Sequence, residues 1–334
     1  MQSISRRGFV ISAAAASAAF GLDGTLEFVS PAHAQKGSGA GAAAMDLKER
    51  GFARFTVGDM KVTTVFDGVW EKAHDAGFIK NASVDETKAA LKKAGLSGDV
   101  VPVTFTVTFV EIGGKTIMFD SGTGGQAGGP KAGMLSKANL AKAGIDPAKI
   151  STIVVTHFHG DHILGLMAKG TNAQVFPNAE IVVPEAEYKY WTDPALVEKL
   201  PEARRGLTKR IQATFPTWKN IRPLADGKEA IAGVVALNTN GHTPGHTSYQ
   251  VSSGGRQFIV SGDVTNIASL FVANPGWHVA FDQDAVKAEA SRRALFERVV
   301  KEKTVVTGYH WGMPGAGTIE KDGKGYALVP VSVT

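Results

Sequence analysis

The sequence predicts an α+β fold in which two mixed β-sheets pack together and helices cover them on the outside. Predicted strands recur in both halves of the chain, and helices interrupt the strand meanders, which suits two packed sheets. The chain has 334 residues, of which 43% are hydrophobic and 20% charged, so it can bury a full core. It contains no cysteine, which excludes disulfides, thiolate zinc sites and a cysteine nucleophile.

Residues 1–34 resemble a twin-arginine signal peptide and are not expected to belong to the fold. The pair Arg6-Arg7 precedes a weakly apolar segment over residues 10–20, and Ala32-His33-Ala34 supplies the small residues that a signal peptidase reads. The apolar segment is too short and too mild to remain as a membrane helix. We therefore expect a periplasmic or secreted protein without a stable membrane anchor once the signal has been cleaved.

The rest of the chain is predicted to form a flexible Gly/Ala-rich lead-in over residues 35–50 and one domain over residues 51–334. In its first part, β-branched alternation predicts a strand pair, a Gly113-Gly114 turn predicts a hairpin, and Ser83 and Glu86 have the spacing of a capping box. The predicted strands cover residues 55–66, 103–112 and 115–119, and the helices cover 84–94 and 134–143.

The second part begins with a continuous apolar run over residues 150–156, which is typical of a strand buried on both faces. Further strands are predicted over residues 181–183, 231–237, 247–251, 257–260 and 304–307. Helical segments are predicted over residues 185–211, with interruptions at Pro194 and Pro201, and over 284–303.

The densest group of metal-binding side chains directly follows the strand of residues 150–156. The segment from His157 to His162 contains three histidines and one aspartate within six residues. Residues two apart in extended backbone point the same way, so His157 and His159 can share one ion. Gly160 permits a turn, after which Asp161 and His162 can face a second ion. These ligand types suit zinc, with iron, manganese, cobalt and nickel as alternatives.

Three further polar groups follow predicted strands: Gly241-His242-Thr243-Pro244-Gly245-His246, Ser261-Gly262-Asp263 and Gly308-Tyr309-His310. Each is a weak signal alone, because an isolated aspartate at a strand end is commonly a turn or cap residue. Folded sheets gather catalytic groups at strand ends, so the shared placement of these groups favours one common site.

In order and spacing, these motifs resemble the ligand set of the metallo-β-lactamase superfamily. The resemblance covers residues from about 55 to 331 and implies the αββα sandwich of that family. It implies three ligands for each of two metals and one shared carboxylate: His157, His159 and His242 for the first, Asp161, His162 and His310 for the second, and Asp263 for both. Asp120 and His246 are then supporting residues.

Within the family, the sequence is most similar to methyl parathion hydrolases and lactonase-like relatives. The similar stretches are Gly58 to Thr63, Phe176 to Ala179, Asn240 to Thr247 and Lys324 to Tyr326. The resemblance implies hydrolysis by a metal-bound hydroxide, since two divalent ions lower the pKa of a shared water to about 7. Asp161 and Asp263 are the expected catalytic carboxylates. Better-known N-acyl homoserine lactonases carry a tyrosine just after the bridging aspartate, whereas here Val264, Thr265 and Asn266 follow it.

The expected substrates are small molecules, namely lactones, esters or aryl phosphotriesters, because an apolar pocket would favour uncharged compounds. Candidate pocket residues are the aromatic side chains Phe158, Trp191, Phe271, Trp277 and Trp311. The loop over residues 122–129 lacks the ending of a phosphate-binding P-loop. The net charge is +5, but no basic stripe interleaves with aromatics, so nucleic-acid binding is not expected. Relatives often form homodimers, which makes a dimer a further expectation.

Two alternatives stay open at this point. A β-lactamase or a thioester hydrolase of the glyoxalase II type would use the same fold, although Asp263 as a bridging carboxylate points away from lactamases. A periplasmic zinc-binding protein without catalysis would use the same side chains to store zinc. Turnover of any ester discriminates between catalysis and storage.

Overall fold

The computed structural model describes residues 47–334, so the predicted signal peptide and most of the predicted lead-in lie outside the described residues. The last part of that lead-in needs correction, because residues 47–50 form a helical turn. This turn belongs to the fold since Leu47 is buried in a small cluster with Ala53 and Met313. Within residues 47–334, the structure contains no helix with the length and apolar composition needed to cross a bilayer.

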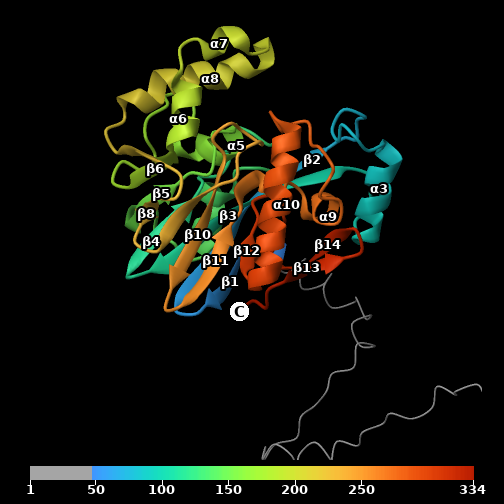
Figure 1. The fold of residues 1–334 in the computed structure, drawn as a ribbon. Helices are drawn as coiled ribbons and strands as arrows, with labels where there is room; N and C mark the ends of the chain where they lie inside the picture. The colour runs from blue at the N-terminus through green and yellow to red at the C-terminus, as the bar shows by residue number, and fades with distance from the viewer. Residues whose placement is uncertain (1–46) are drawn as a thin grey trace, which may run out of the picture. The chain divides into compact units, whose positions relative to one another are not determined.

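The first half of the domain forms a seven-stranded mixed sheet whose strands lie in chain order (Figure 1). Strands β1 to β4 pair antiparallel and strands β4 to β7 pair parallel. The strands are β1 (Phe52–Val57), β2 (Met60–Lys72), β3 (Val101–Ile112), β4 (Lys115–Phe119), β5 (Ile150–Val154), β6 (Glu180–Pro184) and β7 (Ile221–Leu224). All but β7 were predicted, with ends that differ by a few residues.

The second half forms another seven-stranded sheet, in the order β14-β13-β12-β11-β10-β9-β8. Only β11 and β12 pair parallel. The strands are β8 (Glu229–Ile231), β9 (Val234–Asn238), β10 (Thr247–Ser253), β11 (Arg256–Val260), β12 (Val305–Thr307), β13 (Ala316–Asp322) and β14 (Gly325–Pro330). The prediction of one strand over residues 231–237 is wrong. Gly233 has a φ of 83°, so the chain turns there and makes two strands.

The core between the two sheets explains why they pack together. Val62 and Phe119 of the first sheet share one buried cluster with Tyr249 and Phe258 of the second. Tyr249 is fully buried, and its hydroxyl donates a hydrogen bond to the carbonyl oxygen of Val155 at 2.8 Å. Burial of alternate side chains from both sheets makes one continuous core. The predicted sandwich of two mixed sheets is thereby confirmed.

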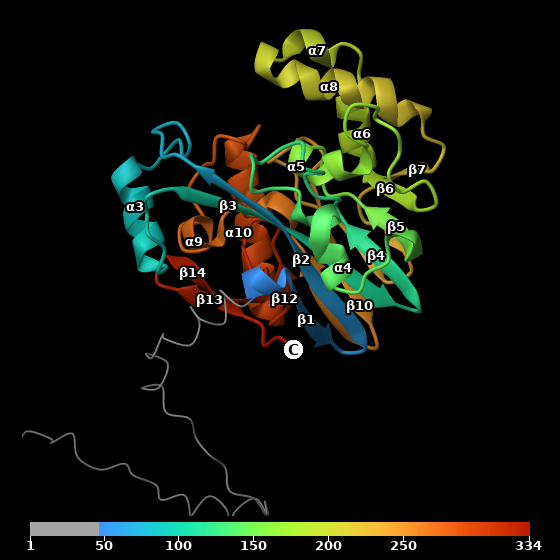
Figure 2. The same ribbon diagram turned by 180° about the vertical axis from the view of Figure 1, so that it is seen from behind.

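Helices cover the outer faces of the sheets (Figures 1 and 2). On the second sheet, the long helix α10 buries Leu295, Phe296 and Val299 against strand residues such as Val306. The helices are α3 (Val84–Lys93), α4 (Leu140–Lys142), α5 (Gly160–Ile163), α6 (Glu185–Thr192), α7 (Leu196–Lys199), α8 (Glu202–Thr214), α9 (Ala268–Phe271) and α10 (Ala285–Glu302). The capping box predicted for α3 is present at Ser83 and Glu86. The predicted helix over residues 134–143 is a π-helical turn, Leu135–Asn139, followed by α4.

Candidate metal centre

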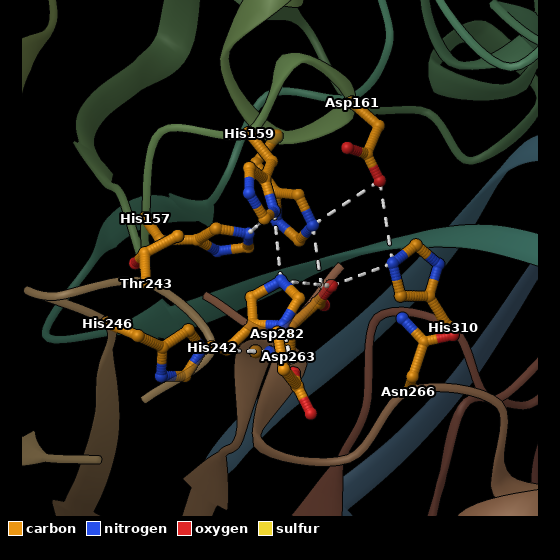
Figure 3. Close-up of polar contacts among 12 residues, drawn as sticks. His157, His159, Asp161, His242, Thr243, His246, Asp263, Asn266, Asp282 and His310 are labelled. Carbon is orange, nitrogen blue, oxygen red and sulfur yellow. Dashed lines mark hydrogen bonds and ion pairs between the residues drawn. The ribbon is translucent and has the colours of Figure 1, made fainter. Parts of the chain in front are cut away.

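Segments that leave strands of both sheets bring their histidines and aspartates to one place (Figure 3). The segment after β5 supplies His157 and His159, and the segment after β9 supplies His242. Nδ1 of His159 lies 3.0 Å from Nε2 of His157 and 2.9 Å from Nε2 of His242. These three side chains form the first ligand group.

A second ligand group lies beside the first. The carboxylate oxygen Oδ2 of Asp161 is 3.5 Å from Nε2 of His162 and 3.5 Å from Nε2 of His310. His162 and His310 are buried, whereas the side chain of Asp161 is 21% exposed. The second group therefore has one open side, where a substrate could approach.

Asp263 lies between the two groups. Its Oδ1 is 3.3 Å from Nε2 of His162, while its Oδ2 is 2.9 Å from Nε2 of His310 and 3.3 Å from Nε2 of His242. The carboxylate thus faces histidines of both groups. The structure brings together all seven side chains that the sequence predicts as ligands.

The outer ring nitrogens show which way each imidazole is oriented. Nδ1 of His162 faces Asp120 at 2.8 Å and Nδ1 of His242 faces Asp282 at 2.8 Å. Nδ1 of His310 faces the carbonyl oxygen of Thr104 at 2.7 Å. Because these partners accept hydrogen bonds, they hold the proton on Nδ1 and leave the Nε2 lone pairs facing the centre.

The donor set fits divalent cations. Nε2 of His162 and Oδ1 of Asp263 are buried and have no hydrogen-bond partner among the described residues. Buried polar atoms without a partner are costly and rare, so converging lone pairs call for a positive charge between them. Imidazole nitrogens and carboxylate oxygens are ligands that zinc takes in catalytic sites.

Histidines of the two ligand groups differ in the direction in which their pKa values are shifted. Burial, together with neighbouring histidines, lowers the pKa of His157 and of His159 well below the ordinary value. For His162, burial opposes the charged form, but the carboxylates of Asp263 and Asp161 raise its pKa well above the ordinary value. Burial would raise the pKa of Asp263, yet His310 and His162 hold it well below its usual range.

The two predicted supporting residues lie behind the ligands. Asp120 follows β4 with a φ of 60°, and it accepts hydrogen bonds from the backbone N–H of Thr156 at 2.7 Å and from His162. His246 accepts the backbone N–H of Asp263 on Nε2 at 2.9 Å and faces Thr239 with Nδ1 at 3.0 Å. Both ring nitrogens of His246 are therefore engaged away from the centre.

The role predicted for Gly160 needs correction. Gly160 is the first residue of helix α5, and His159 precedes it in extended backbone with φ −68° and ψ 152°. The chain turns by entering a helix, which uses ordinary backbone angles and needs no left-handed glycine. Asp161 and His162 then lie in the first turn of that helix.

Comparison with known proteins identifies the family. Residues 102–310 match the model of the metallo-β-lactamase superfamily, and this segment makes up more than half of the chain. The chain belongs to the metallo-β-lactamase superfamily. The αββα sandwich described above is that family's fold.

Curated relatives of this metallo-β-lactamase family member include lactonases. It is 31% identical over 170 residues to an N-acyl homoserine lactonase from a Bacillus species and 30% identical over 196 residues to the N-acyl homoserine lactonase AttM from Azorhizobium caulinodans. The two matches cover 50% and 57% of this chain and 58% and 68% of the relatives. A third match, to the uncharacterised protein YobT of Bacillus subtilis, covers 44% of that relative. The chain thus spans about half the length of the first curated relatives it matches.

The matches to solved structures cover more of the chain than the matches to the curated relatives do. A dizinc quorum-quenching lactonase, AidC, in complex with its product N-hexanoyl-L-homoserine, has a TM-score of 0.74 at 25% identity. The hydrolase AbOPH of the β-lactamase superfamily has a TM-score of 0.76 at 27% identity. Each comparison covers 84% of this chain and 98% of the other. The similarity to methyl parathion hydrolases stays a prediction.

Four of the seven predicted ligands line the polar part, or floor, of a cavity of about 300 Å³. His159, Asp161, Asp263 and His310 line the floor, and Arg204 and Gln283 are further polar lining residues. The apolar walls are Trp70, Val103, Phe105, Ala127, Trp191, Leu200, Leu207 and Phe281.

Most of the predicted pocket aromatics lie elsewhere. Trp191 lines the cavity, but Phe158, Phe271, Trp277 and Trp311 do not. Phe158 and Phe271 are fully buried in the core, while Trp277 and Trp311 pack against core clusters from the outside. The ring of Phe158 packs edge-on against Phe215 in the core, with 5.1 Å between the ring centroids. Trp70, Phe105 and Phe281, which sequence reasoning missed, form the aromatic wall instead.

Sequence reasoning also missed buried residues that support the ligands. Asp282 accepts the His242 hydrogen bond, and Arg292 lies 3.5 Å from Asp282 while donating to the carbonyl oxygens of Val264, Pro275 and Trp277. The amide nitrogen of Asn266, which Figure 3 also draws, is buried without a hydrogen-bond partner among the described residues. None of these residues belongs to a motif with metal-ligand spacing, so no sequence signal marked them.

Proposed function

We propose that the protein is exported and hydrolyses uncharged lactones or esters, aryl phosphotriesters included, at a two-metal centre. The observation that carries this proposal is the cavity, whose lining joins many apolar side chains to four members of the ligand groups. Such walls would cover the acyl or aryl part of a substrate, while the polar floor meets the bond to be cleaved. The lactonase relatives and AidC support the lactone class.

The ligand groups define which residues would hold the metals. His157, His159 and His242 would hold one divalent ion. Asp161, His162 and His310 would hold the other, with Asp263 shared between them. The chemistry that such a pair supplies when bound is Lewis acidity toward the substrate oxygen and activation of a water at neutral pH. We expect zinc, with iron, manganese, cobalt or nickel as alternatives, and elemental analysis of the purified protein decides among them.

The chain's own residues prepare the site for this chemistry. Asp120 and Asp282 fix the orientation of His162 and His242 by accepting their outer ring protons. Tyr309 donates a hydrogen bond from its hydroxyl to the backbone carbonyl of Asp161 at 2.6 Å. This bond holds the backbone of Asp161, the partly exposed member of the second group, in place. Asp161 and Asp263 line the cavity floor and are the carboxylates that we assign to catalysis.

Export is supported by the N-terminal sequence alone. Arg6-Arg7, the apolar segment after it and Ala32-His33-Ala34 are the features of a twin-arginine signal. We propose a periplasmic or secreted location. Fractionation of cells that express the full chain, compared with an Arg6→Lys/Arg7→Lys variant, tests this, because the variant is expected to stay in the cytoplasm.

The decisive test of function is a comparison of two substrates. Residues 35–334 would be produced with zinc and assayed on N-hexanoyl homoserine lactone and on methyl parathion, each beside His157→Ala. Metal-dependent turnover of either compound, lost in the variant, is the expected result, and the ratio of kcat/KM ranks the two substrate classes. Two bound metals without turnover of either compound would refute the proposed substrates. A protein that binds no metal would refute the proposed centre.

A further inference from the structure

A buried carboxylate that no catalytic step uses connects the two loops of the first ligand group. Glu187, in the first turn of α6, is 0% exposed. Its Oε1 accepts hydrogen bonds from the backbone N–H of Phe158 at 2.9 Å and from the indole Nε1 of Trp191 at 2.6 Å. Its Oε2 accepts hydrogen bonds from Thr243 Oγ1 at 2.8 Å and from the backbone N–H of Gly245 at 2.9 Å.

The four donors belong to parts of the active site that lie far apart in sequence. Phe158 stands between His157 and His159, and Thr243 directly follows His242. Trp191 lines the cavity, and the centroid of its ring lies 6.3 Å from that of His159. One side chain therefore joins the histidine loop after β5, the histidine loop after β9 and the aromatic wall.

We propose that Glu187 is a positioning residue that sets the distance between the His157/His159 loop and the His242 loop, and thereby the affinity of the first ligand group for its metal. The proposal rests on the proposed two-metal function, because it concerns the same ligands. Among the described residues, Glu187 hydrogen-bonds none of the seven ligand side chains, so it acts through the residues beside them.

The chemistry of the donors requires a carboxylate at this position. Two backbone N–H groups and an indole N–H are donors only, and they approach both oxygens of the side chain. A glutamine would turn its NH₂ group toward at least one of these donors. An aspartate keeps both oxygens but is one methylene shorter, so it would not reach both loops.

Close packing shows that the loop is built to lie on α6. A Cβ atom on Gly245 would lie 2.1 Å from the backbone nitrogen of Glu187, which no real contact allows. Only glycine lets the loop after β9 approach the helix so closely. The close contact at Gly245 and the hydrogen bonds of Glu187 thus both hold the loop after β9 against helix α6.

None of the hydrogen bonds of Glu187 among the described residues reaches a side chain of the second ligand group. Asp161 is tied to Tyr309, His162 to Asp120, and His310 to Thr104. Loss of Glu187 should therefore weaken one metal site and spare the other. A residue that only stabilised the fold would not discriminate between the two sites.

The test is a titration of metal-free protein with Zn²⁺ alone. Wild type, Glu187→Gln, Thr243→Val and the control Glu185→Gln would be compared by calorimetry and by competition with a chelator. Glu185 is a matched control, because it lies in the same helix but pairs with Lys189 on the surface. We expect Glu187→Gln to weaken one of the two binding events about 10- to 100-fold, Thr243→Val to weaken the same event less, and Glu185→Gln to change neither.

Several outcomes would overturn the proposal. These are unchanged affinity at both sites in Glu187→Gln, equal weakening of both sites, or a lowered Tm with wild-type zinc binding. If Glu187→Gln does not fold, Thr243→Val decides, since it removes a single donor; wild-type zinc affinity in that folded variant overturns the proposal. Hydrolysis by the wild type is scored separately, so absence of turnover refutes the proposed function while the zinc titration still tests Glu187.

Discussion

At the scale of single residues, Asp263 faces His162 from the first sheet and both His242 and His310 from the second. Asp263→Asn removes the negative charge that both ligand groups share. We expect kcat/KM to fall by more than the roughly 10- to 100-fold that loss of an outer partner of a metal ligand costs, together with loss of bound metal. Asp85→Asn, on the exposed face of α3, is the control; equal metal content in the two variants would contradict a bridging role.

His246 supports a prediction about pH. Burial lowers its pKa to about 3, whereas an unfolded chain has a value of about 6.5. A depressed pKa gives stability that is fully present above pH 6.5 and is lost as pH falls through 6.5 toward 3. In metal-free protein this loss amounts to about 2 kcal/mol at pH 5. His246→Gln keeps an acceptor for the Asp263 N–H and should lose less stability between pH 7 and 5 in urea unfolding; an equal loss in both proteins would argue against the assignment.

At the scale of elements, helix α10 anchors the segment that carries Asp282. Arg292 is fully buried, and three carbonyl oxygens and Asp282 surround its guanidinium group. Arg292→Met leaves these acceptors unpaired, so we expect a loss of about 3–5 kcal/mol in the free energy of unfolding. Arg293→Met is the neighbouring control, since Arg293 is half exposed and pairs with Glu289, and should cost about 0–1 kcal/mol. Similar costs in urea unfolding would contradict the anchoring role.

The elements differ in how far the sequence could predict them. Strands such as β5 were predictable because an apolar β-branched run is a local property. The ligands were predictable as well, because they lie in short motifs at strand ends, which are also local features of the sequence. Glu187 could not be predicted, because its donors at Phe158 and Gly245 meet it only through tertiary packing. The prediction of the pocket aromatics was mostly wrong for a similar reason. Nearness to a ligand in sequence does not decide which way a side chain points, as the fully buried Phe158 shows.

At the scale of the whole molecule, strands β2 and β3, helices α6 and α8 and segments that follow strands of the second sheet line one cavity. Its volume of about 300 Å³ limits the acyl or aryl group that fits. Leu207→Trp would narrow the cavity, and we expect kcat/KM for long-chain lactones to fall about 10-fold, the effect of one or two excluded methylenes, with little change for short-chain lactones. Leu96→Trp, at an exposed position, is the control. A uniform fall across chain lengths would show that the substitution damages the centre and does not restrict the cavity.

The division of the ligands between the two sheets also has a consequence for biosynthesis. His157, His159, Asp161 and His162 emerge from the ribosome early, but the first ligand group lacks a member until His242 has been made, and the second until His310 has been made. Neither group can therefore be complete on a short nascent chain. Completion of either ligand group must wait until the second sheet has been synthesised and has docked on the first, so the proposed centre would take up the ions available in the compartment where the chain completes its folding.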